Sequence, residues 1–173
     1  MGLQKQPPQQ PPSTNRLLQA LFSENNHPRS KLLPATIRER VLKEFPQAYS
    51  LAENGSAYVA LFPCSLEEFE KYKHNHLSEP ELITNLLDQQ RTFQRSSGLH
   101  LQDMYTTPSQ RNNHVAFNTL LHAINQHDPT RNKPIYTKTN TQAGFNIVEK
   151  LAQETNRVIY NGTTTHRGIL TNF

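Results

Sequence analysis

Polar side chains near the C-terminal end of the chain have the types that phosphate chemistry needs. They are a tyrosine, a lysine, an arginine, a histidine and two threonines: Tyr136, Lys138, Thr164, Thr165, His166 and Arg167. A histidine can act as general acid or base, a cationic side chain can stabilise a phosphorane, and a tyrosine can stack on a base. We predict catalytic roles for His166, Lys138 and Tyr136. We predict ligand-binding roles for Arg167, Thr164 and Thr165.

The same C-terminal cluster also fits two interpretations without catalysis. The set could bind a phosphorylated ligand and leave it unchanged. Alternatively, Asn161-Gly162 is a strong turn dipeptide and threonines suit strand edges, so the stretch would be the polar loop of a closing hairpin. The sequence leaves these alternatives open, because residue order does not show which side chains converge.

The single cysteine, Cys64, offers a different chemistry. It lies between Pro63 and Ser65 at the expected start of a helix, where backbone amides favour a nucleophilic thiolate. The competing interpretation is a small apolar residue at the end of a buried strand. We favour the second, because most free cysteines are buried and unreactive. One cysteine also excludes a disulfide within the chain and indicates a reducing compartment.

Residues that could hold a metal or cofactor are not grouped in the sequence. His74 and His76 lie two positions apart, with Glu79 as the nearest further ligand, but imidazoles near a helix end more often complement the helix dipole. The motifs of a zinc protease, a phosphate-binding glycine loop and a hydrolase nucleophile are all missing. We therefore expect no metal and no cofactor.

Capping signals and apolar spacing predict the helices that must position these residues. Ser65 and Ser78 are each followed three residues later by a glutamate, Glu68 and Glu81, which is the pattern of a capping box. Other helices are predicted from apolar residues at helical spacing. They span residues 14–22, 35–45, 114–128 and 141–155.

Short apolar runs predict the strands. Residues 57–62 form a nearly continuous run that is typical of a buried strand. Residues 96–113 are expected to be a long irregular connection with a short strand at 99–105. Alternation along the next strand puts Tyr136 and Lys138 on one face, opposite Ile135. The predicted C-terminal strands are 133–139, 157–161 and 167–173.

Together these elements predict an α+β fold with five or six helices around a small, mainly antiparallel sheet formed largely by the C-terminal half. Residues 1–13 are predicted to be a disordered Pro/Gln-rich leader, because proline blocks regular hydrogen bonding and nothing there can be buried. Residues 14–173 are predicted to form one domain, with a helical N-terminal half and a β-α-β-β C-terminal part.

Charge and hydropathy set limits on partners and location. The net charge of +4 permits an acidic partner without requiring one, and the basic residues are scattered rather than gathered. A nucleic acid partner therefore has weak support, and a protein partner is the expected one. No apolar run approaches the ~20 residues that span a bilayer. We predict no membrane insertion and a soluble, cytoplasmic protein.

The leading functional prediction is a small protein that acts by binding another macromolecule, because each catalytic signature is missing. Its 30 Asn and Gln residues, its leader and its lack of enzyme motifs resemble in style the effector proteins that intracellular bacteria deliver into host cells. That resemblance implies a bacterial protein acting on a host protein, delivered without a classical signal peptide. Whether the chain is an enzyme stays open; the alternative is an enzyme that acts on RNA or another phosphate-bearing substrate through the C-terminal cluster.

Overall fold

The computed structural model describes residues 14–139, 141–162 and 164–166, the last three without their side chains. The helices are α1 (Thr14–Phe22), α2 (Ala35–Glu44), α3 (Leu66–Lys73), α4 (Glu79–Asp88), α5 (Val115–His127) and α6 (Gln142–Thr155). The strands are β1 (Tyr49–Leu51), β2 (Ala57–Cys64), β3 (Gly98–Thr106), β4 (Ile135–Thr137), β5 (Ile159–Asn161) and β6 (Thr164–His166). The predicted leader at 1–13 lies outside the described residues.

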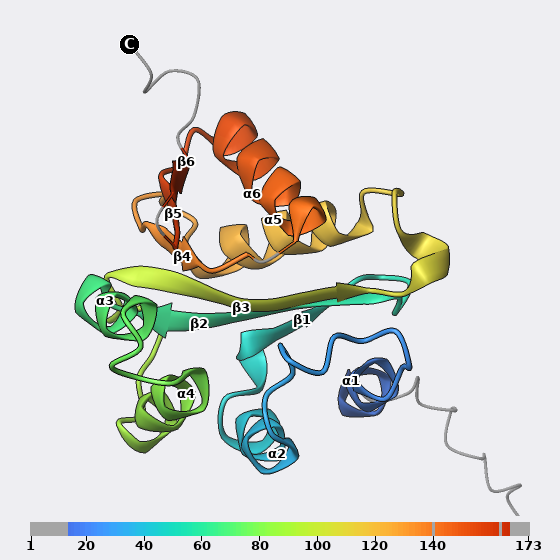
Figure 1. The fold of residues 1–173 in the computed structure, drawn as a ribbon, viewed down its shortest axis with the longest axis horizontal. Coiled ribbons are helices and arrows are strands. Elements are labelled where there is room, and N and C mark those ends of the chain that lie inside the picture. The colour runs from blue at the N-terminus through green and yellow to red at the C-terminus, as the bar shows by residue number, and fades with distance from the viewer. Residues whose placement is uncertain (1–13, 140, 163, 167–173) are drawn as a thin grey trace, which may run out of the picture.

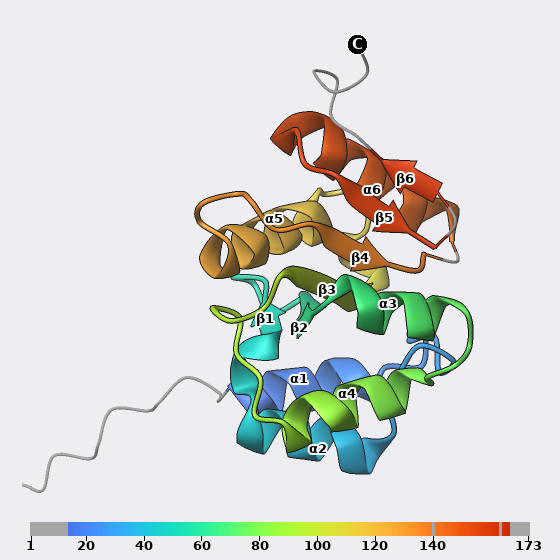
Figure 2. The same ribbon diagram turned by 90° about the vertical axis from the view of Figure 1, so that its left-hand side faces the viewer.

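The strands form one mixed sheet between two layers of helices. Their order is β1-β2-β3-β4-β5-β6. The first three strands are an antiparallel meander, β3, β4 and β5 run parallel, and β6 returns antiparallel to β5. Helices α5 and α6 are crossovers that step in the same direction, so right-handed connections place both on one face. Figure 1 shows them on that face, with α1, α2 and α4 on the other, and Figure 2 shows the same layers from the side.

The α+β class is confirmed, and the six helices of the described residues fall within the predicted number. The sheet differs in detail from the prediction. It is mixed, because α5 (13 residues) and α6 (14 residues) each return the chain to the end of the sheet where the preceding strand began. The next strand therefore runs parallel to that one. Four of the six strands of the described residues, β3 to β6, lie in the C-terminal half as predicted, although the long strand β2 comes from the N-terminal half.

Two local predictions also need correction. Strand β1 was not among the predicted strands. Thr164–His166, predicted as the polar loop of the last hairpin, form strand β6, in which His166 pairs with Ile159. The turn at Gly162 is tighter than predicted, and its φ of +58° suits glycine. The predicted strand at 167–173 lies outside the described residues.

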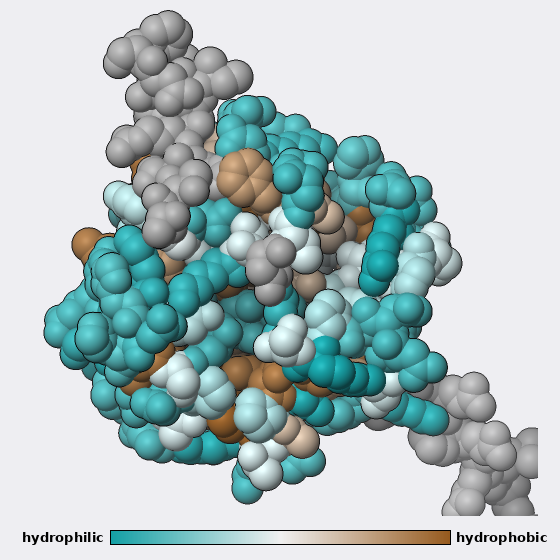
Figure 3. All heavy atoms as spheres, in the orientation of Figure 1, coloured by the Kyte–Doolittle hydropathy of each residue, from teal (hydrophilic) through white to brown (hydrophobic). Residues whose placement is uncertain are grey.

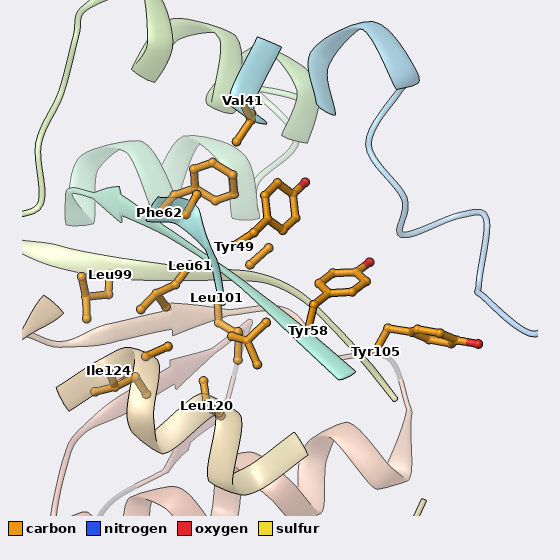
Figure 4. Packing of buried hydrophobic residues seen from close by; sticks show 14 of the residues in the cluster. Val41, Tyr49, Tyr58, Leu61, Phe62, Leu99, Leu101, Tyr105, Leu120 and Ile124 are labelled. Carbon is orange, nitrogen blue, oxygen red and sulfur yellow. The ribbon is translucent and has the colours of Figure 1, made fainter. Parts of the chain in front are cut away.

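Strand β2 is the centre of the hydrophobic core. All eight of its residues are buried, because helices cover both faces of the sheet there. In Figure 4, Leu61 points toward Leu120 and Ile124 of α5, whereas Phe62 points to the opposite side, toward Val41 of α2. The same figure shows that Leu99 of β3 lies on the α5 side, as the pleat requires.

A β-bulge interrupts the pairing of β2 with β3. Ala60 pairs with Asp103 and Leu61 pairs with Leu101, so Gln102 has no partner on β2. Such an extra residue shifts the side-chain alternation of its strand by one. His100 before the bulge and Asp103 after it consequently face the same layer, that of α1 to α4.

Asp103 belongs to a buried polar network that fastens the segment before α2 to the sheet. The Tyr58 hydroxyl donates to Asp103, and its oxygen lies 2.5 Å from His27 Nε2. His27 also stacks against Tyr105, with the ring centroids 4.4 Å apart. Burial raises the pKa of Asp103 to about 6, although the hydrogen bond from Tyr58 opposes the shift. Burial also lowers the pKa of His27.

A second buried polar contact joins the end of α5 to the start of β5. Arg157 donates to the Asp128 carboxylate at 2.5 Å and to its backbone carbonyl at 3.2 Å. Burial alone would raise the pKa of Asp128, but hydrogen bonds from Arg157 and from the backbone N–H of Lys133 lower it overall.

Replacing Arg157 with methionine should lower the free energy of unfolding by about 3–5 kcal/mol, because Asp128 would keep a buried charge without a partner. Urea unfolding followed by circular dichroism measures the change. Arg40→Met is the matched control. Arg40 pairs with Glu44 and Asp88, but its side chain is 34% exposed, so its loss should cost less than about 1 kcal/mol. Equal losses in the two variants would contradict the prediction.

Wild type should lose stability relative to Asp103→Asn between about pH 4 and about pH 7. The pKa of Asp103 in the folded protein, about 6, lies above the ordinary value of 3.8, so the folded protein holds a proton that the unfolded chain releases. A shift of about two units corresponds to at most ~3 kcal/mol. His27 has the opposite sign, so the measured quantity is the difference between two proteins that both contain it.

Urea unfolding at several pH values would give this difference. Asp88→Asn is the control, because the Asp88 side chain is 59% exposed. Its stability should follow that of wild type across the whole range. Parallel pH curves for wild type and Asp103→Asn would show that the prediction is wrong.

Candidate functional site

A polar cavity of about 490 Å³ lies where β4 and β5 end and β3 continues. The carboxyl ends of parallel strands are the usual place for ligand sites in such sheets. In Figure 3 this face of the molecule is hollowed near its centre, and mainly hydrophilic side chains surround the hollow. The residues that line the cavity are Ser30, Lys31, Tyr72, Glu79, His100, Leu101, Gln102, Lys138, Thr139, Phe145, Asn161 and Gly162.

Lys138 is the residue directly after β4, and it lines the cavity. Its Nζ donates to the carbonyl oxygen of Tyr72 at 3.3 Å and lies 4.2 Å from the centre of the Tyr72 ring. The connection is held in place by Asn161, whose side chain accepts from the Thr139 N–H at 2.9 Å and donates to the Thr139 hydroxyl at 2.7 Å. The position of Lys138 is therefore set before any ligand binds.

Lys31 supplies a second cation at the opposite wall. Its backbone carbonyl accepts from the side-chain amide of Gln102 at 3.0 Å, so the bulge residue holds the segment that carries it. Within the described residues, neither Lys31 nor Lys138 forms an ion pair with a carboxylate. The charged lining of the cavity thus consists of two lysines without an ion pair and one carboxylate, that of Glu79.

The carboxylate of Glu79, the first residue of α4, is engaged on both oxygens. Oε1 lies 3.0 Å from His100 Nε2, and Oε2 accepts from the Tyr72 hydroxyl at 3.0 Å. The side chain of Glu79 is 22% exposed, whereas that of His100 is 1% exposed. With Nε2–H donating to the carboxylate, His100 Nδ1 is buried and has no partner among the described residues.

Lys138 and Tyr136, two of the predicted catalytic residues, have different surroundings. Lys138 lines the cavity, as described above. Tyr136 is 2% exposed and stacks between Phe69 and Tyr160, with centroid distances of 5.0 and 5.7 Å. Its ring approaches Gly98 so closely that a Cβ there would lie 2.4 Å from it. Tyr136 is therefore part of the packing beneath the cavity and not of its lining.

The other predicted site residues fall on or beyond β6. Thr164, Thr165 and His166 form that strand, and their side chains lie outside the described residues. His166 pairs with Ile159 at the start of β5, whereas the cavity is at Asn161, where β5 ends. Arg167 also lies outside the described residues.

Of the twelve residues that line the cavity, only Lys138 was predicted as a site residue, so Lys31, Glu79 and His100 were all missed. Glu79 was noted as the nearest further ligand to His74 and His76, but it lies in a helix start whose glutamates we assigned to capping. His100 lies in a stretch that we expected to be mainly irregular. The break in alternation at Gln102 was a signal for the bulge, because three polar residues among apolar ones fit no single strand face.

The other chemistries considered for the sequence find little support. Cys64 is 1% exposed and packs against Phe69 and Tyr136, and burial raises the pKa of its thiol to about 12. This agrees with the buried apolar role. Among the described residues, no three His, Cys, Asp or Glu side chains gather as a metal site would require. None of the described helices is long and apolar enough to cross a bilayer.

Comparison with protein-family models, with curated proteins and with solved structures gave no match. Neither the fold nor the cavity is therefore assigned by similarity.

The Cys64 thiol should be almost unreactive in the folded protein. With a pKa of about 12 it carries very little thiolate near pH 8, and the buried sulfur is also shielded from reagents. Reaction with dithionitrobenzoate should be at least about a hundredfold slower in buffer than in urea. Cys64→Ser serves as the blank, and rapid labelling of the native protein would contradict the buried role.

Proposed function

We propose that the protein binds RNA in the cavity at the ends of β4 and β5. The observation that carries the proposal is the pair of lysines in the lining, Lys31 and Lys138, which outnumber its one carboxylate, Glu79, and form no ion pair among the described residues. A lysine ammonium is a point charge that suits phosphate oxygens. The remaining lining is mostly polar, which fits a hydrophilic ligand better than an apolar one.

RNA binding keeps the expectation that the protein acts on another macromolecule, but it replaces a protein partner with a nucleic acid. A protein partner would need an apolar docking patch at its centre. Within the described residues, one large hydrophobic side chain, Leu66, is exposed. The cavity therefore gives the stronger argument, and it retains Lys138 from the C-terminal cluster as a ligand-binding residue.

The charge of Lys138 should account for one phosphate contact. Lys138→Gln should weaken binding of a fluorescent single-stranded RNA of about ten nucleotides by about tenfold. The slope of log affinity against log salt concentration should fall by about 0.7, the value for one contact to a single strand. Fluorescence anisotropy at several salt concentrations measures both quantities.

Lys43→Gln is the matched control, because Lys43 is an exposed lysine in the last turn of α2 and lines neither this cavity nor its neighbour. It should bind RNA as wild type does. The proposal is overturned if wild type does not bind the RNA, or if the two lysine variants lose the same affinity and the same salt slope.

A further inference from the structure

A second hollow of about 420 Å³ lies beside the cavity and shares three residues with it. The shared residues are Tyr72, Glu79 and Lys138. They stand at the junction of two spaces, each large enough for one nucleotide-sized group. A chain-like ligand that occupied both spaces would therefore cross these three side chains.

The junction brings together a carboxylate and an ammonium without pairing them. Tyr72 contacts both, because its hydroxyl donates to Glu79 at 3.0 Å while its carbonyl oxygen and ring contact Lys138. Within the described residues, the recorded ion pair of Glu79 is with His100 and not with Lys138. A carboxylate and an ammonium thus both contact Tyr72 at this junction, the carboxylate at its hydroxyl and the ammonium at its ring and carbonyl oxygen.

His100 gives an independent sign that this arrangement is more than packing. It lies on the central strand β3 and is 1% exposed, yet its Nδ1 is buried without a partner among the described residues. Leaving such an atom unpaired lowers the stability of the fold. Unsatisfied polar atoms of this kind are uncommon and call for an explanation such as a catalytic role. Here the imidazole orients the carboxylate of Glu79.

We propose that the junction cleaves RNA, with the phosphodiester between two nucleotides lying at Lys138 and with Glu79 as the general base; this rests on the RNA binding proposed above. His100 and Tyr72 are positioning residues that hold the carboxylate. The Lys138 ammonium stabilises the negative charge that develops on the phosphorane.

The reaction is a transesterification that needs no co-reactant. Glu79 accepts the proton of the ribose 2′-hydroxyl, whose oxygen forms a bond to phosphorus. The bond from phosphorus to the 5′-oxygen of the next nucleotide breaks, and that oxygen takes a proton from solvent. The products are a 2′,3′-cyclic phosphate and a 5′-hydroxyl. Glu79 then releases its proton to solvent, which restores the starting state.

Glu79→Gln tests the role of the base, because it removes the proton acceptor and keeps the size of the side chain. Cleavage of an end-labelled single-stranded RNA should slow by at least about a hundredfold, as loss of a general base does. Binding of the same sequence with 2′-O-methyl groups, which cannot react, should stay within about threefold of wild type. Mass spectrometry should find 2′,3′-cyclic phosphate ends.

Glu67→Gln is the matched control, because the Glu67 side chain is 81% exposed on α3 and lines neither hollow. It should cleave as wild type does. A substrate with one 2′-deoxy nucleotide gives a test that needs no variant, since wild type should spare that linkage alone. Thermal unfolding would show whether each variant is folded.

The outcomes separate the two proposals. Binding of 2′-O-methyl RNA without cleavage of RNA by wild type would overturn the cleavage proposal and leave RNA binding standing. Absence of both would overturn both. Equal cleavage by wild type and Glu79→Gln, products with other ends, or cutting at the 2′-deoxy linkage would each remove Glu79 from the role of general base.

Discussion

The register break at Gln102 is the constraint on which the rest of the polar architecture depends. In an uninterrupted strand, His100 and Asp103 would point to opposite faces of the sheet. Because the bulge adds one residue to β3, both face the layer of α1 to α4. His100 can then reach Glu79 on α4, and Asp103 can reach His27 in the segment before α2. One extra residue in a central strand thus serves both the anchoring of a loop and the wall of the cavity.

Three pairs of polar side chains differ in how far they are enclosed. They are Asp103 with His27, Asp128 with Arg157, and Glu79 with His100. Two of them, one in the segment before α2 and one between α5 and β5, are enclosed on all sides, with both side chains at most 4% exposed. They can hold elements together but cannot meet a ligand. Glu79 differs, because its carboxylate is 22% exposed and borders two hollows while its partner His100 is enclosed. A functional side chain needs this combination, because it must reach a ligand while a buried partner fixes its orientation.

The sequence predicted local structure well where the signal was itself local. The capping box at Ser65 forms as expected, and at Ser78 the serine oxygen accepts from the Glu81 N–H, which is one half of the predicted box; both bonds lie within one turn. Lys138 was found because it is a cation on the face of the predicted strand 133–139 that also carries Tyr136. Glu79 and His100 were missed because their contact joins residues 21 apart and depends on the bulge. The parallel pairing of β3, β4 and β5 was missed because it joins residues far apart in the sequence. It depends on how α5 and α6 carry the chain across the sheet.

The length of the strands explains why the cavity opens where it does. β4 and β5 have three residues each, whereas β3 has nine, so β3 continues past the point where Thr137 pairs with Leu101. The connections that leave β4 and β5 must therefore turn beside the part of β3 that extends beyond its pairing with β4, and their first residues become the walls of a hollow. Such connections can change without disturbing the core. Here Asn161 holds Thr139 by two hydrogen bonds and so fixes the neighbouring Lys138. A connecting loop does not need such bonds, whereas a charge that is positioned before its ligand binds does.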